Sequence, residues 1–418
     1  MPTCTLDAAA TPAYCSDCAS AFLAGVLISI LASTASSRPP LDRSGSLTTQ
    51  EPSLGHLTTP EQPRRARSPF ATPSTPSTSP SSLGSPVRLD EPHNPHPHPE
   101  QQYLDLARNI LDRGERRKTP KGVGALALFA PPPLRFALSR LANPLDSSSP
   151  LESVVPLLTT KRVDFRAIVE ELLWMLKGKT DAHVLRSEIW NGNSSREYLD
   201  GRGLVDHVEG DTGPGYGFQW RHAGAAYRGK DDAYEGEGVD QLARLIESIK
   251  HEAEKRKHIL CAWSAADLDQ MALAPCPCLV QFYVHSLPPS SASTSSTSAE
   301  PPPRLSCTVY QRSADVALGI PYDIAAYALL AHLVARLTGT VAAELTFMFG
   351  DAHVYYDHVD GLRRQLERAP KGDGFPTITL SRSREELEAT GGVDGVEESD
   401  FELRGYEPAG RISFVLHP

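Results

Sequence analysis

The residues best suited to covalent chemistry stand in the second half of the chain. Cys276 ends the segment Met271–Cys276, and Arg312 and Asp323 follow it. A cysteine attacks as its thiolate, a guanidinium binds anions such as phosphate, and a carboxylate can contact a base. These residue types fit covalent chemistry on a nucleotide. The alternative is that Cys276 is a buried structural residue, as free cysteines often are.

The other cysteines indicate a reducing environment. The chain has seven cysteines, an odd number that does not suit a secreted disulfide framework. We therefore expect a cytoplasmic protein, with the nucleus as the alternative. Cys15 and Cys18 have the spacing of a zinc or redox site, but no second pair accompanies them. Cys278 would point away from Cys276 on an extended segment, so we interpret it as a core residue.

Composition separates a low-complexity beginning from a globular remainder. Residues 1–98 are rich in Ser, Thr and Pro from residue 36 onward, so we expect a disordered extension. Residues 99–418 are predicted to form one domain. The apolar stretch Phe22–Ala32 is shorter than the ~20 residues of a membrane helix, and no membrane association is expected. A net charge of -10 without a sustained basic stripe gives no reason to expect DNA binding.

Apolar periodicity predicts the elements that must position these side chains. Spacings of three and four residues predict amphipathic helices over Phe165–Leu176 and Val239–Ile249, and Ile324–Leu337 is apolar enough for a buried helix. Residues 286–303 form a Ser/Thr/Pro insert that we interpret as a long loop. The pattern indicates an α+β fold, a mixed sheet packed with helices. Three apolar runs are predicted to be strands: 258–263, 279–284 and 305–310.

Six blocks of sequence resemble those of the thymidylate synthase family, in the family's order. The resemblance runs from about Glu100 to the end of the chain. It implies a single α+β domain, a homodimer with a shared phosphate site, and 5,10-methylenetetrahydrofolate as the source of both carbon and hydride, with no metal. The blocks are Glu171–Trp174, Ile189–Asn193, Gly210–His222, Gly238–Gln241, Gln311–Asp315 and Gly350–Tyr355.

The resemblance implies a catalytic role for four positions. Cys276 matches the thiol that adds to C6 of the pyrimidine and so makes C5 nucleophilic. Glu171 matches the carboxylate that organises water and relays protons. Tyr216 matches the tyrosine near the C5 proton, and Arg312 matches a phosphate ligand.

The resemblance also implies binding positions. Arg256 and Lys257 match two cations that the partner subunit donates to the phosphate; without the blocks we would interpret them as a solvated helix end. His353 and Tyr355 match the pair that binds the sugar hydroxyl. Substrate contacts are implied for Arg256, Lys257, Gln311, Ser313, Asp323, His353 and Tyr355. Folate contacts are implied for Trp190, Asn193, Asp315 and Gly319.

Several positions depart from the family pattern. Asp323 replaces the asparagine that reads the base; an amide donates to O4 and accepts from N3–H, whereas an ionised carboxylate only accepts. The related dCMP hydroxymethylases are similar here, carrying Asp. Pro277 replaces a histidine, Pro120 replaces a phosphate-binding arginine, and Ser264 replaces an asparagine. His417–Pro418 replaces the apolar pair that closes over folate.

These departures leave three functions to be distinguished. We expect methylation of dUMP to dTMP. Because of Asp323, methylation or hydroxymethylation of dCMP is the alternative. Trp190 favours a methyl product, since it matches a residue that shields the folate-bound intermediate from water. A weakly active nucleotide-binding paralogue is the third hypothesis.

Overall fold

The computed structural model describes residues 98–119, 122–146, 148–286 and 302–417. The expected extension 1–98 lies outside the described residues except for its last residue. The expected insert 286–303 also lies outside them, apart from its two ends.

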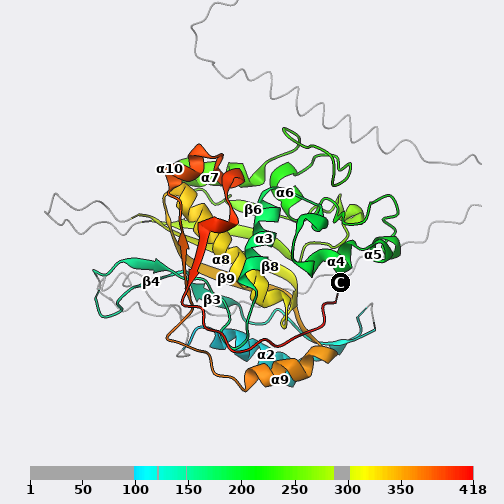
Figure 1. Cartoon of the computed structure of the whole chain (residues 1–418), viewed down its shortest axis with the longest axis horizontal. Helices are drawn as coiled ribbons and strands as arrows, with labels where there is room; N and C mark the ends of the chain where they lie inside the picture. The colour runs from blue at the N-terminus through cyan, green and yellow to red at the C-terminus, as the bar shows by residue number, and fades with distance from the viewer. Residues whose placement is uncertain (1–97, 120–121, 147, 287–301, 418) are drawn as a thin grey trace, which may run out of the picture. The chain divides into compact units, whose positions relative to one another are not determined.

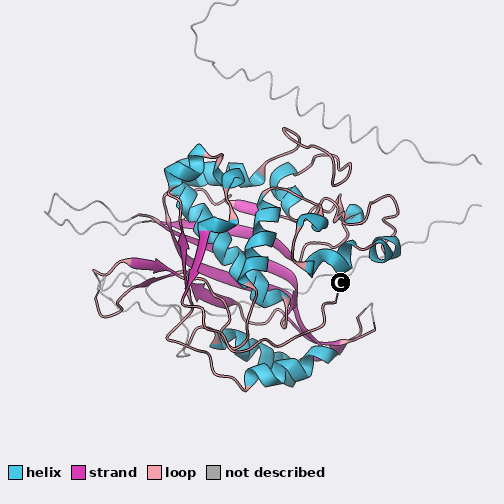
Figure 2. Cartoon of the chain, viewed as in Figure 1, coloured by secondary structure: helices cyan, strands magenta, loops and turns pink. Residues whose placement is uncertain are grey.

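A mixed seven-stranded sheet forms the centre of the described domain (Figures 1 and 2). Its strand order is β1-β2-β9-β8-β7-β6, with β3 also paired to β9. β7 and β8 are antiparallel, whereas β8 and β9 are parallel. The strands are β1 (Glu115–Arg117), β2 (Ala125–Phe129), β3 (Leu134–Ala137), β6 (Ile259–Cys261), β7 (Pro277–His285), β8 (Arg304–Asp315) and β9 (Val341–Tyr355). The predicted strands 279–284 and 305–310 are confirmed as parts of β7 and β8, and the predicted strand 258–263 is confirmed over the shorter β6.

Smaller elements complete the domain. Two small antiparallel sheets pair β4 (Ser139–Leu141) with β5 (Leu151–Ser153), and β10 (Thr377–Leu380) with β11 (Phe401–Arg404). The helices are α2 (Gln101–Arg113), α3 (Phe165–Leu176), α4 (Asn191–Ser194), α5 (Arg196–Gly201), α6 (Gly217–His222), α7 (Gln241–His251), α8 (Gly319–Thr338), α9 (Val359–Leu366) and α10 (Arg384–Ala389). Short 3-10 turns are η1 (Ala182–Val184), η2 (Glu188–Trp190), η3 (Leu268–Gln270), η4 (Tyr356–His358), η5 (Gly392–Gly395) and η6 (Glu398–Asp400).

Helix α8 is the core helix that the sequence predicts. It packs on β8 and β9 and is covered in turn by α3 and α7 (Figure 1). Of the helices in the described ranges, α8 alone is long and apolar enough to cross a membrane, but 83% of its apolar window is buried within the protein. Its apolar surface therefore serves the core. Asp164 and Asp240 accept backbone N–H groups at the starts of α3 and α7, which fixes where both predicted helices begin.

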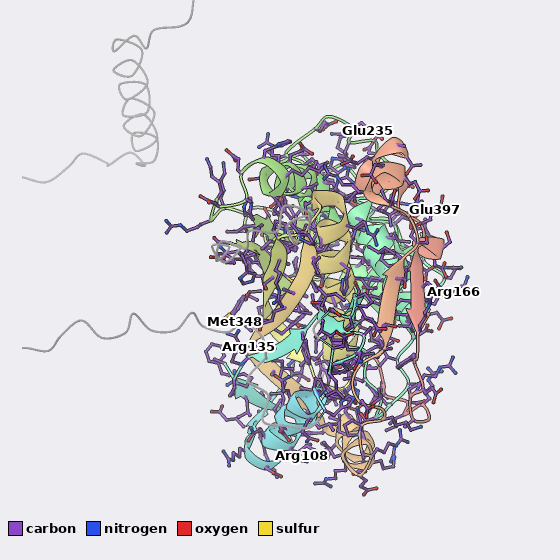
Figure 3. All side chains as sticks on the ribbon, turned by 90° about the vertical axis from the view of Figure 1, so that its left-hand side faces the viewer. Arg108, Arg135, Arg166, Glu235, Met348 and Glu397 are labelled. Carbon is purple, nitrogen blue, oxygen red and sulfur yellow. The ribbon has the colours of Figure 1, made fainter. Side chains whose placement is uncertain are left out.

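The sheet also has a face that these helices do not cover. Tyr283 of β7, Tyr310 of β8 and Met348 of β9 project from it, with 56%, 41% and 47% of their surface exposed. Tyr310 and Met348 are direct neighbours in the pairing of β8 with β9. In Figure 3, Met348 lies on the opposite side of the molecule from Arg166 of α3. We call Tyr283, Tyr310 and Met348 the open face.

Candidate active site

The predicted nucleophile, Cys276, immediately precedes β7 at an irregular point of the sheet. The pairing of β7 with β8 shifts between Pro277 and Leu279, which makes Cys278 the extra residue of a bulge. Pro277 lacks an N–H for the ladder, and it is tolerated because it is the first residue of β7 and adjoins the bulge. The Cys276 carbonyl accepts the backbone N–H of Arg312 at 2.8 Å. The bulge and this bond fix the cysteine beside the end of β8.

Arg312 holds the segment that carries the nucleophile. Its Nε donates to the carbonyl of Pro275 at 2.8 Å, and its Nη2 donates to the carbonyl of Ala274. The guanidinium also lies over the ring of Trp263, 5.6 Å from the ring centre. The arginine predicted to bind phosphate is therefore also a clamp on the loop before Cys276.

The thiol of Cys276 is a neutral group at pH 7. Burial raises its pKa to about 11, outweighing the Arg312 guanidinium, which lowers it, while Asp323 raises it further. The backbone N–H of Cys276 donates to the hydroxyl of Tyr216 at 3.1 Å. Sulfur addition therefore requires that a proton leave Cys276.

Groups that can move protons lie next to this thiol. Trp190 donates its Nε1–H to Glu171 Oε1 at 2.7 Å, and its ring meets the ring of Tyr216 edge to face at 5.2 Å. Burial raises the pKa of Glu171 to about 7, against the lowering effect of the Trp190 hydrogen bond. A carboxyl group with a pKa near the working pH exchanges protons efficiently in both directions. Glu171 is thus suited to the proton relay expected of it.

Tyr216 is held in an unusual backbone conformation. Its φ of 43° is in the left-handed region, which non-glycine residues rarely adopt and which is often found at functional sites. The next residue must be Gly217, because a Cβ there would lie 2.3 Å from the carbonyl of Met175 in α3. Close packing of α6 on α3 therefore aims the tyrosine at the cysteine.

Asp323 and Gln311 form the predicted base-reading part of the site. Gln311 Nε2 donates to Asp323 Oδ2 at 2.6 Å and to the carbonyl of Ser313 at 3.2 Å. Burial, followed by the nearby Glu171, raises the pKa of Asp323 to about 8. Gly319 opens α8 beside this group, where a Cβ would lie 3.7 Å from Asp323 Oδ2. The structure thus places these predicted residues around one point.

The predicted sugar and folate positions share the adjacent ends of β8 and β9. Asp315 pairs with His353 in the strand register, and His353 Nδ1 lies 3.1 Å from Asp351 Oδ1. The rings of His353 and Tyr355 meet edge to face at 5.1 Å. Asn193 is buried, and its Nδ2 has no hydrogen-bond partner within the described part of the chain. An orphaned amide donor of this kind is suited to a ligand acceptor.

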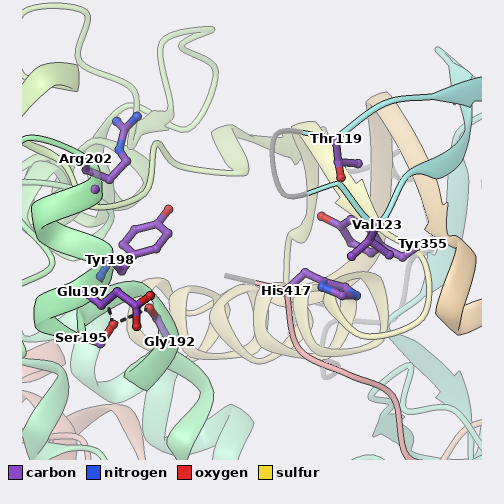
Figure 4. Close-up of a pocket in the computed structure, with 10 residues that line it drawn as sticks. Thr119, Val123, Gly192, Ser195, Glu197, Tyr198, Arg202, Tyr355 and His417 are labelled. Carbon is purple, nitrogen blue, oxygen red and sulfur yellow. Dashed lines mark hydrogen bonds between the residues drawn. The ribbon is translucent and has the colours of Figure 1, made fainter.

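A cavity of about 740 Å³ opens beside Tyr355 (Figure 4). One wall comes from α4 and α5 and the other from the loop before β2 and from His417, whose ring is 4.3 Å from that of Tyr355. Tyr198 and Arg202 were not predicted, because no motif or periodicity marks them. The predicted departures at Pro120 and Pro418 lie outside the described residues. The lining residues are Thr119, Val123, Gly192, Ser195, Glu197, Tyr198, Gly201, Arg202, Tyr355 and His417.

Arg256 and Lys257 are not brought to the site by their own chain. Both are exposed on the turn between α7 and β6, where Lys257 lies 3.7 Å from Glu252. The carbonyl of Arg256 accepts from the side chain of Gln281. Gln281 is four residues beyond Pro277 on β7, about 13 Å at the usual strand rise. These two cations therefore stand apart from Cys276 and Arg312.

One group in the described part of the chain could hold a cation: Asp357, His358 and His417. One ring nitrogen of His358 is already engaged. Its Nε2 donates to the carbonyl of Val415 at 2.7 Å, and its Nδ1 lies 3.6 Å from Asp315. Burial lowers the pKa of His358, but hydrogen bonding to Asp315 raises it above the usual value overall. Because Nε2 of His358 is held by a carbonyl, only its Nδ1 is left for a cation, and the expectation of no metal stays a prediction.

The fold is a mixed α+β domain whose candidate site groups a partly buried cysteine, an arginine and two weakly acidic carboxyl groups. A profile of the family described as thymidylate synthase matches residues 101–417. The chain is 48% identical to thymidylate synthase of Agaricus bisporus over 322 residues, 76% of this chain and 99% of that protein. It is 45% identical to that of Saccharomyces cerevisiae, over 76% and 96%, and 40% identical to that of Homo sapiens, over 77% and 91%. The chain belongs to the thymidylate synthase family and is a folate-dependent methyltransferase, which confirms the expected family and type of enzyme.

Proposed function

We propose that the protein methylates dUMP at C5 to give dTMP, with 5,10-methylenetetrahydrofolate as co-substrate, and that it works as a homodimer. The observation that carries the proposal is the series of contacts that links Cys276 to Tyr216 and, through Trp190, to Glu171, with Arg312 bonded to the residue before Cys276. The names of the relatives support the same reaction, and no comparison favours the dCMP alternative.

The chain's own groups account for the proton movements of such a reaction. Cys276 is a neutral thiol, so its proton must leave as sulfur bonds to C6 of the base. Glu171, with a pKa of about 7, can take up and return protons through water. Tyr216, whose hydroxyl lies by Cys276, is placed to assist removal of the proton at C5. The folate supplies the one-carbon unit and the hydride that reduces it to methyl.

The residues predicted to contact folate fit a polar, flat ligand. The unpartnered Nδ2 of Asn193 can donate to it. Asp315 accepts the backbone N–H of Ala317 at 2.8 Å and keeps further acceptor capacity for ring nitrogens. Trp190 brings an apolar ring next to these groups, and its N–H is already satisfied by Glu171.

Turnover with the two candidate nucleotides tests the reaction. We expect dihydrofolate to form, seen as an absorbance increase, when the protein is incubated with 5,10-methylenetetrahydrofolate and dUMP. A higher kcat/KM for dCMP would contradict the proposed substrate. Tetrahydrofolate released without dihydrofolate would indicate hydroxymethylation, and no turnover with either nucleotide would favour the nucleotide-binding paralogue.

The open face supports the homodimer. Tyr283, Tyr310 and Met348 are large apolar side chains on an uncovered sheet, an arrangement typical of protein interfaces. A groove of about 450 Å³ next to Tyr310 and Met348 is lined by Phe129, itself 82% exposed, and by Pro131–Pro133. A second copy packed on this face would remove these side chains from water.

Mixing two inactive variants tests whether Arg256 of one subunit completes the site of its partner. We expect Arg256→Glu and Cys276→Ser to be inactive separately, and a refolded equal mixture to regain about a quarter of wild-type activity. Half of the dimers would then be mixed, and each would hold one complete site. Each variant refolded alone is the control. A mixture no more active than the two variants would contradict donation of Arg256 across the interface, and sedimentation would report whether dimers form.

A further inference from the structure

Asp323 is a carboxyl group in a place that disfavours its negative charge. It projects from the second turn of α8, beyond the first-turn N–H groups through which a helix dipole stabilises an anion. Within the described residues no basic side chain forms an ion pair with it. The nearest cation of the site, Arg312, gives two of its donors to the carbonyls of Ala274 and Pro275. Glu171 is a second acidic group near Asp323, and its charge opposes the ionisation of Asp323.

Gln311 donates a hydrogen bond to the carboxyl group of Asp323, and this bond makes one of the two carboxyl oxygens an acceptor. Gln311 Nε2 donates to Asp323 Oδ2 at 2.6 Å, so Oδ2 acts as an acceptor. Gln311 Oε1 is buried and has no hydrogen-bond partner within the described residues, so it accepts no proton from Asp323 here. The second oxygen of Asp323, Oδ1, is left for a ligand. A neutral acid would carry its proton on this oxygen.

We propose that Asp323 reads uracil as a neutral carboxylic acid, with Oδ1–H donating to O4 and Oδ2 accepting from N3–H. Oδ2 has two lone pairs, one for Gln311 and one for the base, so each donor and acceptor is satisfied. The acid then presents the same donor and acceptor as the asparagine that it replaces. This inference rests on the proposed methylation of dUMP.

The proposal makes recognition of dUMP depend on a proton. When Asp323 ionises, the donor to O4 is lost and two oxygens with partial or full negative charge face each other. Because its pKa is raised to about 8, the neutral form prevails at lower pH and is lost as pH rises through that value. The neutral fraction then falls about tenfold for each further pH unit. The titratable groups that face Asp323 are Glu171 of α3, Tyr216, Cys276, Asp315 of β8 and Tyr327 of α8 itself.

Equilibrium binding of dUMP to the full chain and to Asp323→Asn, between about pH 6.5 and pH 9.5, tests the idea. The amide keeps the donor at every pH, and titration of the nucleotide or of the other groups affects both proteins. We therefore expect the ratio of Kd for the wild type to Kd for the variant to be flat at low pH and to rise about tenfold per pH unit at high pH. Asp360→Asn, an exposed carboxylate of α9, is the control and should bind like the wild type.

Two results would overturn the inference. The first is a Kd ratio that does not change with pH. The second is tighter binding of dUMP by the wild type as pH rises, which would mean that the ionised form reads the base. Failure of the proposed function is distinguishable, because neither protein would then turn over dUMP at any pH, whereas a flat ratio with active enzyme counts against Asp323 alone.

Discussion

Replacing Cys276 by serine is expected to lower kcat for dUMP by at least about a thousandfold. The site that raises the pKa of the thiol to about 11 by burial would hold a hydroxyl still further from ionisation. Serine is nearly the same size as cysteine. Within the described residues, the Cys276 thiol donates no hydrogen bond that the fold would lose. The fold should therefore persist, and steady-state kinetics beside a thermal unfolding curve measure both effects.

Cys261→Ser is the matched control for this substitution. Cys261 is a partly buried free thiol on β6, and its Sγ contacts the carbonyl of Trp263 at 3.4 Å, a bond that a hydroxyl can replace. This variant should keep activity within about twofold of the wild type. If Cys276→Ser retained more than about a tenth of the activity, covalent addition by this sulfur would be wrong.

Arg312→Ala is expected to have the second largest effect, a loss of about 10²- to 10³-fold in kcat/KM for dUMP. The substitution removes the predicted phosphate ligand and leaves the carbonyls of Ala274 and Pro275 without their donor. Such unsatisfied buried groups cost about 1–3 kcal/mol each. The loop before Cys276 should loosen, so kcat should fall together with affinity.

Arg312→Lys separates these two roles. Lysine keeps the charge but lacks the planar fork that reaches two carbonyls at once. Binding of dUMP should recover in part, while kcat stays low because the loop is not clamped. Titration calorimetry with dUMP and the kcat of both variants provide the comparison. Normal kcat in Arg312→Lys would show that the clamp does not matter for the reaction.

Local patterns in the sequence predicted the elements well. The helices α3, α7 and α8 follow from the spacing of apolar residues, and β6, β7 and β8 follow from short apolar runs. The bulge at Cys278 did not follow, because simple alternation assumes an unbroken ladder. Cys278 is buried, as expected of a core residue. Its Sγ contacts the carbonyl of Pro275, in the loop before Cys276, at 3.5 Å.

The chemistry of the site depends on contacts between residues that are distant in the chain. The bond from Trp190 to Glu171, the bond from Gln311 to Asp323 and the clamp made by Arg312 are tertiary contacts that no local pattern indicates. Burial raises the pKa of both carboxyl groups and raises the pKa of the thiol further. The sequence predicted which residues take part, and the packing shifts the pKa values of those that titrate.

The most direct test of covalent catalysis by Cys276 is to trap its adduct. A 5-fluoro-dUMP molecule has no C5 proton to lose, so the reaction should stop with nucleotide and folate bound to the protein. The account predicts that incubation with 5-fluoro-dUMP and 5,10-methylenetetrahydrofolate gives a stable mass increase equal to both ligands, mapped by peptide mass spectrometry to Cys276. No adduct, or an adduct on Cys261, Cys278 or Cys307, would contradict it.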